Sequence, residues 1–294
     1  MTRKPMYAGS FYPRSESALL KEIDSCFRHK FGPGEFDPAK ALKPAPNPVL
    51  AVISPHAGYR FSGMAAAWSY KALAEADMPD LFIILAPNHR LSKSGISLET
   101  FQTPFGLVRV DQDFANALAE KGTILIDDDV HLPEHSLEVQ LPFLQYVFKA
   151  KEDKIKIVPI LVSSDIDLSK AALDIQETLM DTKKRVAFIV SSDFTHYGTD
   201  YGYLPFRADS KGSVKKKLSE LDGKAIRTII DGNPADFEEF IEETRDTICG
   251  SFPITLLLKT IKFSKAKLQQ YYTSGDLLDD FSNSVSYASI VFYK

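Results

Sequence analysis

Four short apolar runs place the strictest limits on how this chain can fold. They lie at residues 49–53, 81–85, 155–162 and 186–190. Each is rich in Val, Ile and Leu and lacks the alternation of polar and apolar residues typical of a half-exposed strand, so each fits a strand buried on both faces of a sheet. Helical stretches at about 62–76 and 168–180 separate neighbouring runs. This strand–helix–strand order predicts parallel pairs joined by right-handed crossovers.

The rest of the chain supplies further elements around that sheet. Turn residues and periodicity predict a hairpin at 95–110, helices at 111–121 and 135–148, polar helices within 209–245, an apolar helix at 252–263, and strands near 267–273 and 285–293. Residues 31–48 are rich in Pro and Gly and are predicted to form a loop. Residues 1–30 are predicted to form an arm and a helix that pack on the main body. The predicted fold is a single α/β domain over 1–294, with a mixed, mostly parallel central sheet flanked by helices.

Composition excludes several classes of protein. With 44% hydrophobic and 25% charged residues, the chain has the make-up of a globular protein. Its formal charge of −4, with both signs interspersed, gives no general attraction to nucleic acid or anionic membranes. No apolar run reaches the roughly 20 residues of a membrane span, and the first residues lack the apolar stretch of a signal peptide. Two cysteines far apart favour a reducing compartment, so we expect a cytoplasmic protein.

Three histidines follow three of the buried runs. His56 comes just after 49–53, His89 after 81–85 and His196 after 186–190. Ligands of open α/β sheets bind at the carboxyl ends of the strands, and neutral imidazoles are common ligands of iron, zinc and copper. A single histidine in a loop is more often a surface or capping residue, but three at equivalent positions predict a shared metal pocket.

Other residues near these loops have both a functional and a structural interpretation. Gly58 fits either a close approach of the backbone to a ligand or an ordinary turn. Asp193 fits either a carboxylate that holds the second N–H of His196 or a turn cap. Cys249 lies just before a predicted helix, where a thiol tends toward a lower pKa and serves as a ligand or nucleophile. The alternative is a small buried apolar residue.

The start of the predicted helix at 135–148 carries another polar group of residues. Glu134 and His135, with Glu138 one turn later, either supply polar groups to the pocket or form a solvated first turn. His131 is expected at the surface and Cys26 in the core.

Seven short motifs, taken together, resemble the Memo family over essentially the whole chain. In chain order they are Ala8-Gly9-Ser10-Phe11-Tyr12-Pro13, Pro55-His56-Ala57-Gly58-Tyr59, Pro87-Asn88-His89, Glu134-His135-Ser136, Ser191-Ser192-Asp193-Phe194-Thr195-His196-Tyr197-Gly198, Ile248-Cys249-Gly250 and Ser284-Val285-Ser286-Tyr287-Ala288. Each motif alone is weak, and the ordered set is specific.

The resemblance implies a fold similar to that of class III extradiol dioxygenases, the non-haem iron enzymes that open catechol rings. It also implies a pocket that binds iron (Fe2+), with copper as the alternative. Carried over by motif, the metal ligands are His56, His89 and Cys249. His196 is the base, with Asp193 beside it. The residues around them are Glu134, His135, Gly58, Tyr59 and Asn88.

Two classes of function follow from this interpretation. The first is a metal-dependent redox or oxygenase-type enzyme acting on a small phenolic or peptide ligand. The second is a non-catalytic binding or adaptor protein that uses the same pocket for an acidic or phosphorylated peptide, or for metal handling. Cys249 stands where the dioxygenases have a carboxylate, which supports the second class. Zinc hydrolysis is a third idea, without an HExxH motif to support it. The resemblance further implies association with a radical-SAM protein and a small partner-domain protein.

Overall fold

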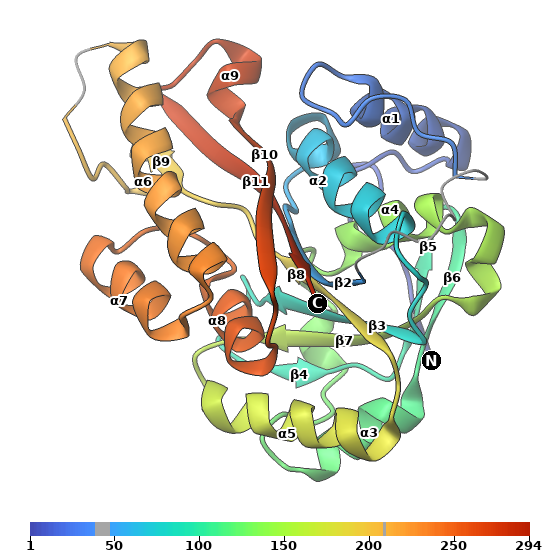
Figure 1. Cartoon of the computed structure of the whole chain (residues 1–294). Helices are drawn as coiled ribbons and strands as arrows, with labels where there is room; N and C mark the ends of the chain where they lie inside the picture. Colours follow the sequence, from blue (N-terminus) through green and yellow to red (C-terminus); the bar gives the residue numbers. More distant parts are fainter. Residues whose placement is uncertain (39–47, 208–209) are drawn as a thin grey trace.

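The computed structural model describes residues 1–38, 48–207 and 210–294, which form an 11-stranded mixed sheet covered by helices (Figure 1). The strands are β1 (Thr2–Arg3), β2 (Val49–Ser54), β3 (Leu81–Pro87), β4 (Gly95–Ile96), β5 (Thr100–Thr103), β6 (Gly106–Val110), β7 (Lys156–Val162), β8 (Val186–Ser191), β9 (His196–Gly198), β10 (Lys265–Thr273) and β11 (Asn283–Tyr293). The α-helices are α1 (Glu16–Arg28), α2 (Tyr59–Ala74), α3 (Gln112–Glu120), α4 (Leu141–Val147), α5 (Leu168–Thr182), α6 (Lys211–Asp231), α7 (Pro234–Thr244), α8 (Ser251–Thr260) and α9 (Ser274–Leu278). Among these described helices, none has the length and apolar character needed to cross a membrane.

The four apolar runs lie side by side in the middle of the sheet. The strand order is β1-β5-β6-β7-β3-β8-β2-β11-β10, and the pairs β7–β3, β3–β8 and β8–β2 are all parallel. The antiparallel strand β11 extends the sheet beyond β2. The predicted α/β class with a mixed, mostly parallel sheet is therefore confirmed.

Helices bury both faces of this sheet, as Figure 1 shows. On one face α1, α2 and α4 share a core with side chains of β2 and β3. On the other face α3, α5 and α8 pack against the opposite side chains of the same strands. Helix α1 belongs to the first core, because Leu19, Ile23 and Phe27 are buried there. Of the loop predicted at 31–48, residues 39–47 lie outside the described part.

The predicted helix at 135–148 is wrong in its first half. A 3-10 turn covers Glu138–Gln140 and the α-helix begins only at Leu141. Pro142 explains the late start, since a proline inside a helix clashes with the carbonyl four residues earlier and is tolerated only in the first turn. The residues before this turn make contacts that a helix would prevent: Ser136 Oγ, for example, donates to the carbonyl of Pro87.

Glu138 ties the N-terminal arm to the body rather than serving the pocket. Its carboxylate lies 2.6 Å from Arg3 Nη1, and both side chains are almost fully buried. It also accepts hydrogen bonds from the backbone N–H of Tyr7 and from the hydroxyl of Tyr12. His131, expected at the surface, is also buried: its Nε2 lies 3.0 Å from the carbonyl oxygen of Gly95, and burial lowers its pKa to about 4.

Gly63 lies inside α2, where that helix packs against α1. A Cβ atom on Gly63 would collide with Sγ of Cys26, which is buried as predicted. The missing side chain therefore sets how closely the two helices approach.

Two buried carboxylates share one hydroxyl on the loop that follows β8. Thr195 Oγ1 lies 2.7 Å from Asp222 Oδ1 and 2.9 Å from Asp246 Oδ1. A hydroxyl has one proton to donate, so the second carboxyl must itself carry a proton to form its hydrogen bond. Burial and then the nearby charge of Asp222 raise the pKa of Asp246 to about 7. The pair thus holds one proton at pH values where an unfolded chain has lost it.

We expect Gly63→Ala to lower the free energy of unfolding by about 1–3 kcal/mol through overpacking. The same change should cost much less in a Cys26→Ala background, because the colliding sulfur is gone. Gly223→Ala, at an open position of α6, should instead stabilise by about 0.5–1 kcal/mol. Urea denaturation of the four proteins and the wild type measures these differences. An equal cost of Gly63→Ala in both backgrounds would contradict the proposed contact.

The Asp222–Asp246 pair predicts a pH-dependent stability. Because the folded-state pKa of Asp246 lies above the ordinary value, its contribution is fully present at low pH and is lost as pH rises from about 4 to 7. Relative to Asp246→Asn, the wild type should therefore lose up to about 1.4 kcal/mol per pH unit across that window. Asp153→Asn, at an exposed position, is the matched control and should parallel the wild type. Parallel curves for Asp246→Asn and the wild type would show that no proton is held there.

Candidate metal centre

The predicted histidines gather at the carboxyl edge of the sheet. Ser54 at the end of β2 pairs with Ser191 at the end of β8, and β3 ends beside them, so the loops that follow start close together. The rings of His56 and His89 have centroids 5.1 Å apart. Together with His135 and His196 they line one cavity of about 400 Å³. The central prediction, that histidines from distant stretches meet at this edge, agrees with this geometry.

His56 is held in a defined tautomer by Ser191. The imidazole is buried, with Nδ1 2.8 Å from Ser191 Oγ. Ser191 Oγ donates its own proton to the carbonyl of Ser136 at 2.6 Å and accepts from Gln140 Nε2 at 2.8 Å. It can therefore only accept from His56 Nδ1–H. Burial, followed by the neighbouring histidines, lowers the pKa of His56, which leaves a neutral ring with a lone pair on Nε2.

Glu134 fixes His89 in the same way. Its carboxylate lies 3.0 Å from His89 Nδ1 and accepts the backbone N–H of His89 at 2.6 Å and that of Ser136 at 2.9 Å. Burial acts to raise the pKa of Glu134, but the imidazoles of His135 and His89 and the Ser136 N–H outweigh it and hold the pKa below its ordinary range. A carboxylate acceptor places the proton on Nδ1 of His89, so that Nε2 is free. Metal-binding histidines commonly have such a partner.

His196 lines the cavity but lies outside the closest groups of donor atoms. Its Nδ1 lies 3.0 Å from the carbonyl of Phe194 and 3.2 Å from that of Thr247. Both partners are acceptors, so Nδ1 carries the proton and Nε2 is available as a base. The alternative in which Asp193 holds this N–H is wrong. Asp193 Oδ1 instead accepts the backbone N–H of His56 at 2.9 Å, and so positions the loop after β2.

Cys249 reaches the site through the close packing of the glycine that follows it. A Cβ on Gly250 would collide with Ser192, so only glycine lets the two loops approach. Cys249 Sγ lies 3.2 Å from His56 Nε2 and accepts the backbone N–H of Asp193 at 3.2 Å. Gly250 is the N-cap of α8. The expected lowering of the thiol pKa is wrong, since burial and then the charge of Asp193 raise it.

His135 is closer to the centre than the sequence indicated. Donor atoms of His56, His89 and His135 lie within 4.8 Å of one another, as do those of His56, Asp193 and Cys249. The His135 ring stacks on His89 with centroids 4.8 Å apart. Its buried Nδ1 has no hydrogen-bond partner and lies 3.1 Å from Glu134 Oε1 without the alignment of a hydrogen bond.

The donor set fits a transition metal. Two groups of candidate ligands share His56 and present nitrogen, sulfur and carboxylate oxygen, the mixture that iron, copper and zinc accept. The buried Nδ1 of His135 has no hydrogen-bond partner, and burial keeps the thiol of Cys249 in its neutral form. A cation held at Cys249 would reverse this preference, because a coordinated thiol is deprotonated outright.

Three other predicted pocket residues have smaller roles. Gly58 lines the cavity, but a Cβ there would make only ordinary contacts. Asn88 and Tyr59 do not line it. The Asn88 side chain shapes the turn after β3 by accepting the backbone N–H of Leu91, and the Tyr59 hydroxyl donates to the carbonyl of Val139. Phe11, from the N-terminal arm, also lines the cavity and lies against His135 with ring centroids 4.4 Å apart, a contact that no local sequence signal predicted.

Comparisons with known proteins agree with the motifs. The family model "Memo-like protein" matches residues 3–291. A MEMO1 family protein from Methanopyrus kandleri is 36% identical over 306 residues, covering 100% of each chain. One from Thermococcus kodakarensis is also 36% identical over 306 residues, again with 100% of each chain covered.

A solved structure supports the fold. The crystal structure of an uncharacterized protein from Escherichia coli K12 matches with a TM-score of 0.53 at 12% identity, and the match covers 83% of this chain and 99% of that one. This likeness concerns the fold alone. The match of the family model over nearly the whole length, together with full-length relatives at 36% identity, identifies the chain as a member of the Memo family.

Proposed function

We propose that this protein is a non-haem metal protein with redox activity, in which His56, His89 and Cys249 hold iron, with copper as the alternative metal. The observation that carries the proposal is the orientation of the imidazoles. Nδ1 of His56 and of His89 is committed to a hydrogen-bond acceptor, so each ring keeps its Nε2 lone pair for a metal. Bound iron would supply redox chemistry at coordination positions that the protein leaves open.

The size and lining of the cavity support a small aromatic ligand. Its volume of about 400 Å³ is in the range of small-molecule sites. Phe11, Phe61, Tyr201 and Tyr287 contribute aromatic walls. A small phenol or the side chain of a peptide fits this combination, and His196 Nε2 is the group that would take its proton.

An anionic ligand alone is less well supported. Asp193 lines the cavity, the Glu134 carboxylate lies against His89, and the lowered pKa of His56 keeps that ring neutral. An acidic or phosphorylated side chain would therefore meet negative charge without a compensating cation. The binding or adaptor function becomes favourable only if a metal is present first, so both functions depend on metal binding.

Metal analysis tests the ligand assignment. Protein loaded anaerobically with Fe(II) and then desalted should keep stoichiometric iron by elemental analysis, whereas His56→Ala, His89→Ala and Cys249→Ser should lose most of it. Glu134→Gln should weaken metal binding by about 10–100-fold, because a neutral amide fixes His89 less firmly. His29→Ala, which alters a histidine outside the site, is the control. Iron retained in the His56→Ala/His89→Ala double variant would refute these ligands, and parallel loading with copper compares the two metals.

Oxygen uptake tests the redox proposal. The iron-loaded protein should consume O₂ faster when a catechol is added. His196→Ala should keep its iron but lower the catechol-dependent rate by about 10²–10⁴-fold, the usual contribution of a general base. Uptake that does not respond to catechols would contradict turnover of this substrate class while leaving the metal site intact.

A further inference from the structure

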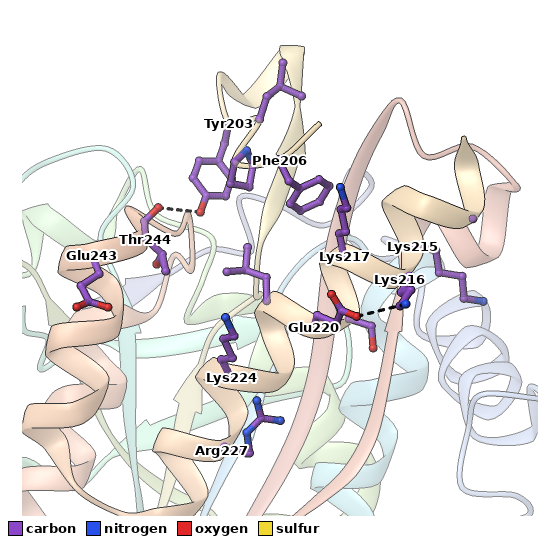
Figure 2. A pocket seen from close by; sticks show the side chains of 15 residues that line it. Tyr203, Phe206, Lys215, Lys216, Lys217, Glu220, Lys224, Arg227, Glu243 and Thr244 are labelled. Atoms are coloured by element: carbon purple, nitrogen blue, oxygen red, sulfur yellow. Dashed lines mark hydrogen bonds and ion pairs between the residues drawn. The ribbon is translucent and has the colours of Figure 1, made fainter. Parts of the chain in front are cut away.

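A hollow with a volume of about 1250 Å³ shares no lining residue with the histidine-lined cavity. It lies between α6, the end of α7 and the segment that leads out of β9, as Figure 2 shows. Nothing in the proposed redox function uses it.

Positive charge dominates one side of this hollow. Lys216, Lys217, Lys224 and Arg227 project from α6, although the chain as a whole has a formal charge of −4. Lys216 has a weak contact with Glu220 at 3.8 Å. Lys224 and Arg227 are exposed and form no ion pair with any residue in the described ranges. Unpaired cations grouped on one helix attract an anionic partner.

The opposite side is an apolar wall that is held in place. Tyr203 donates its hydroxyl proton to the carbonyl of Thr244 at 2.9 Å (Figure 2). Phe206 stacks on Tyr197 with ring centroids 5.1 Å apart and an interplanar angle of 11°. Leu204, between these two, is 55% exposed. The wall thus offers apolar surface to a ligand without having to rearrange.

The same segment also borders the metal cavity. His196 and Tyr201 line that cavity, with their rings 5.2 Å apart, whereas Tyr203 and Phe206 line the basic hollow. A macromolecule bound in the hollow would therefore touch the segment that carries His196.

We propose that this hollow docks an acidic segment of a partner protein, one that carries glutamates or aspartates together with an apolar residue. Lys217 and Arg227 are ten residues apart on α6, which is about 15 Å along the helix axis. Cations spread over this length suit carboxylates spaced along an extended peptide better than one compact phosphate group. The hollow also exceeds the roughly 300–1,000 Å³ of small-molecule sites. Glu220 and Glu243 lie among the cations and would repel the contiguous phosphates of a nucleic acid.

Fluorescence anisotropy with the full-length protein tests the proposal. The probe is a short fluorescein-labelled peptide of glutamates and leucines. Wild-type protein should bind it at low salt, and Lys224→Glu/Arg227→Glu should weaken binding by at least about tenfold through like-charge repulsion. Leu204→Ser should weaken binding of this peptide but not of one in which serine replaces leucine. Both substitutions alter exposed side chains, and circular dichroism with metal content checks that the fold and the metal centre are intact.

The matched control replaces one arginine and one lysine by glutamate at a different place on the surface. Arg109→Glu/Lys170→Glu, at exposed positions outside the hollow, should bind the peptide as the wild type does. Absence of binding, or equal weakening in both double variants, would overturn the proposal. Stronger binding of inorganic tripolyphosphate or single-stranded DNA than of the peptide would also overturn it and assign the hollow to phosphates. None of these results depends on metal binding at His56.

Discussion

The proposed metal centre depends on hydrogen bonds that commit Nδ1 of its histidines. Ser191 can accept from His56 because its own proton is donated to a backbone carbonyl, and the Glu134 carboxylate accepts from His89. These partners fix which nitrogen carries a proton and where the other one points. Both partners are buried, and both belong to segments that also hold the backbone around the site. The orientation of these two rings is therefore built into the folded chain itself.

The thiol adds a second constraint. Cys249 is brought beside His56 by the approach of Gly250 to Ser192, which leaves no space for a side chain. In this position burial favours the neutral thiol, so the residue is a poor nucleophile on its own. A bound cation would reverse that preference, so in the proposed centre Cys249 would ionise only when the metal is present. Asp193, on the loop after β8, supports this arrangement: its carboxylate accepts the backbone N–H of His56, and its own backbone N–H donates to Cys249 Sγ.

Local sequence signals predicted the sheet and the meeting of the histidines, because continuous apolar runs define buried parallel strands and such strands end at one edge. His56 and His89 could therefore be placed from position alone. The role of Glu138 could not, since its partner Arg3 lies 135 residues away and pairs with it only through the tertiary fold. The prediction that the helix begins at residue 135 was wrong, because it relied on the helical spacing of apolar residues and did not consider that Pro142 must lie in the first turn of a helix. The sequence analysis predicted His135 only as a neighbour of the ligands, because the position of its ring depends on contacts with Glu134 and with Phe11 of the N-terminal arm.

The most direct test of the account is X-ray absorption spectroscopy at the iron edge of the anaerobically loaded protein. The account predicts a first coordination shell with one sulfur scatterer and imidazole nitrogens, and loss of the sulfur contribution in Cys249→Ser. A shell of oxygen and nitrogen alone, unchanged by Cys249→Ser, would contradict the claim that His56, His89 and Cys249 hold the metal together.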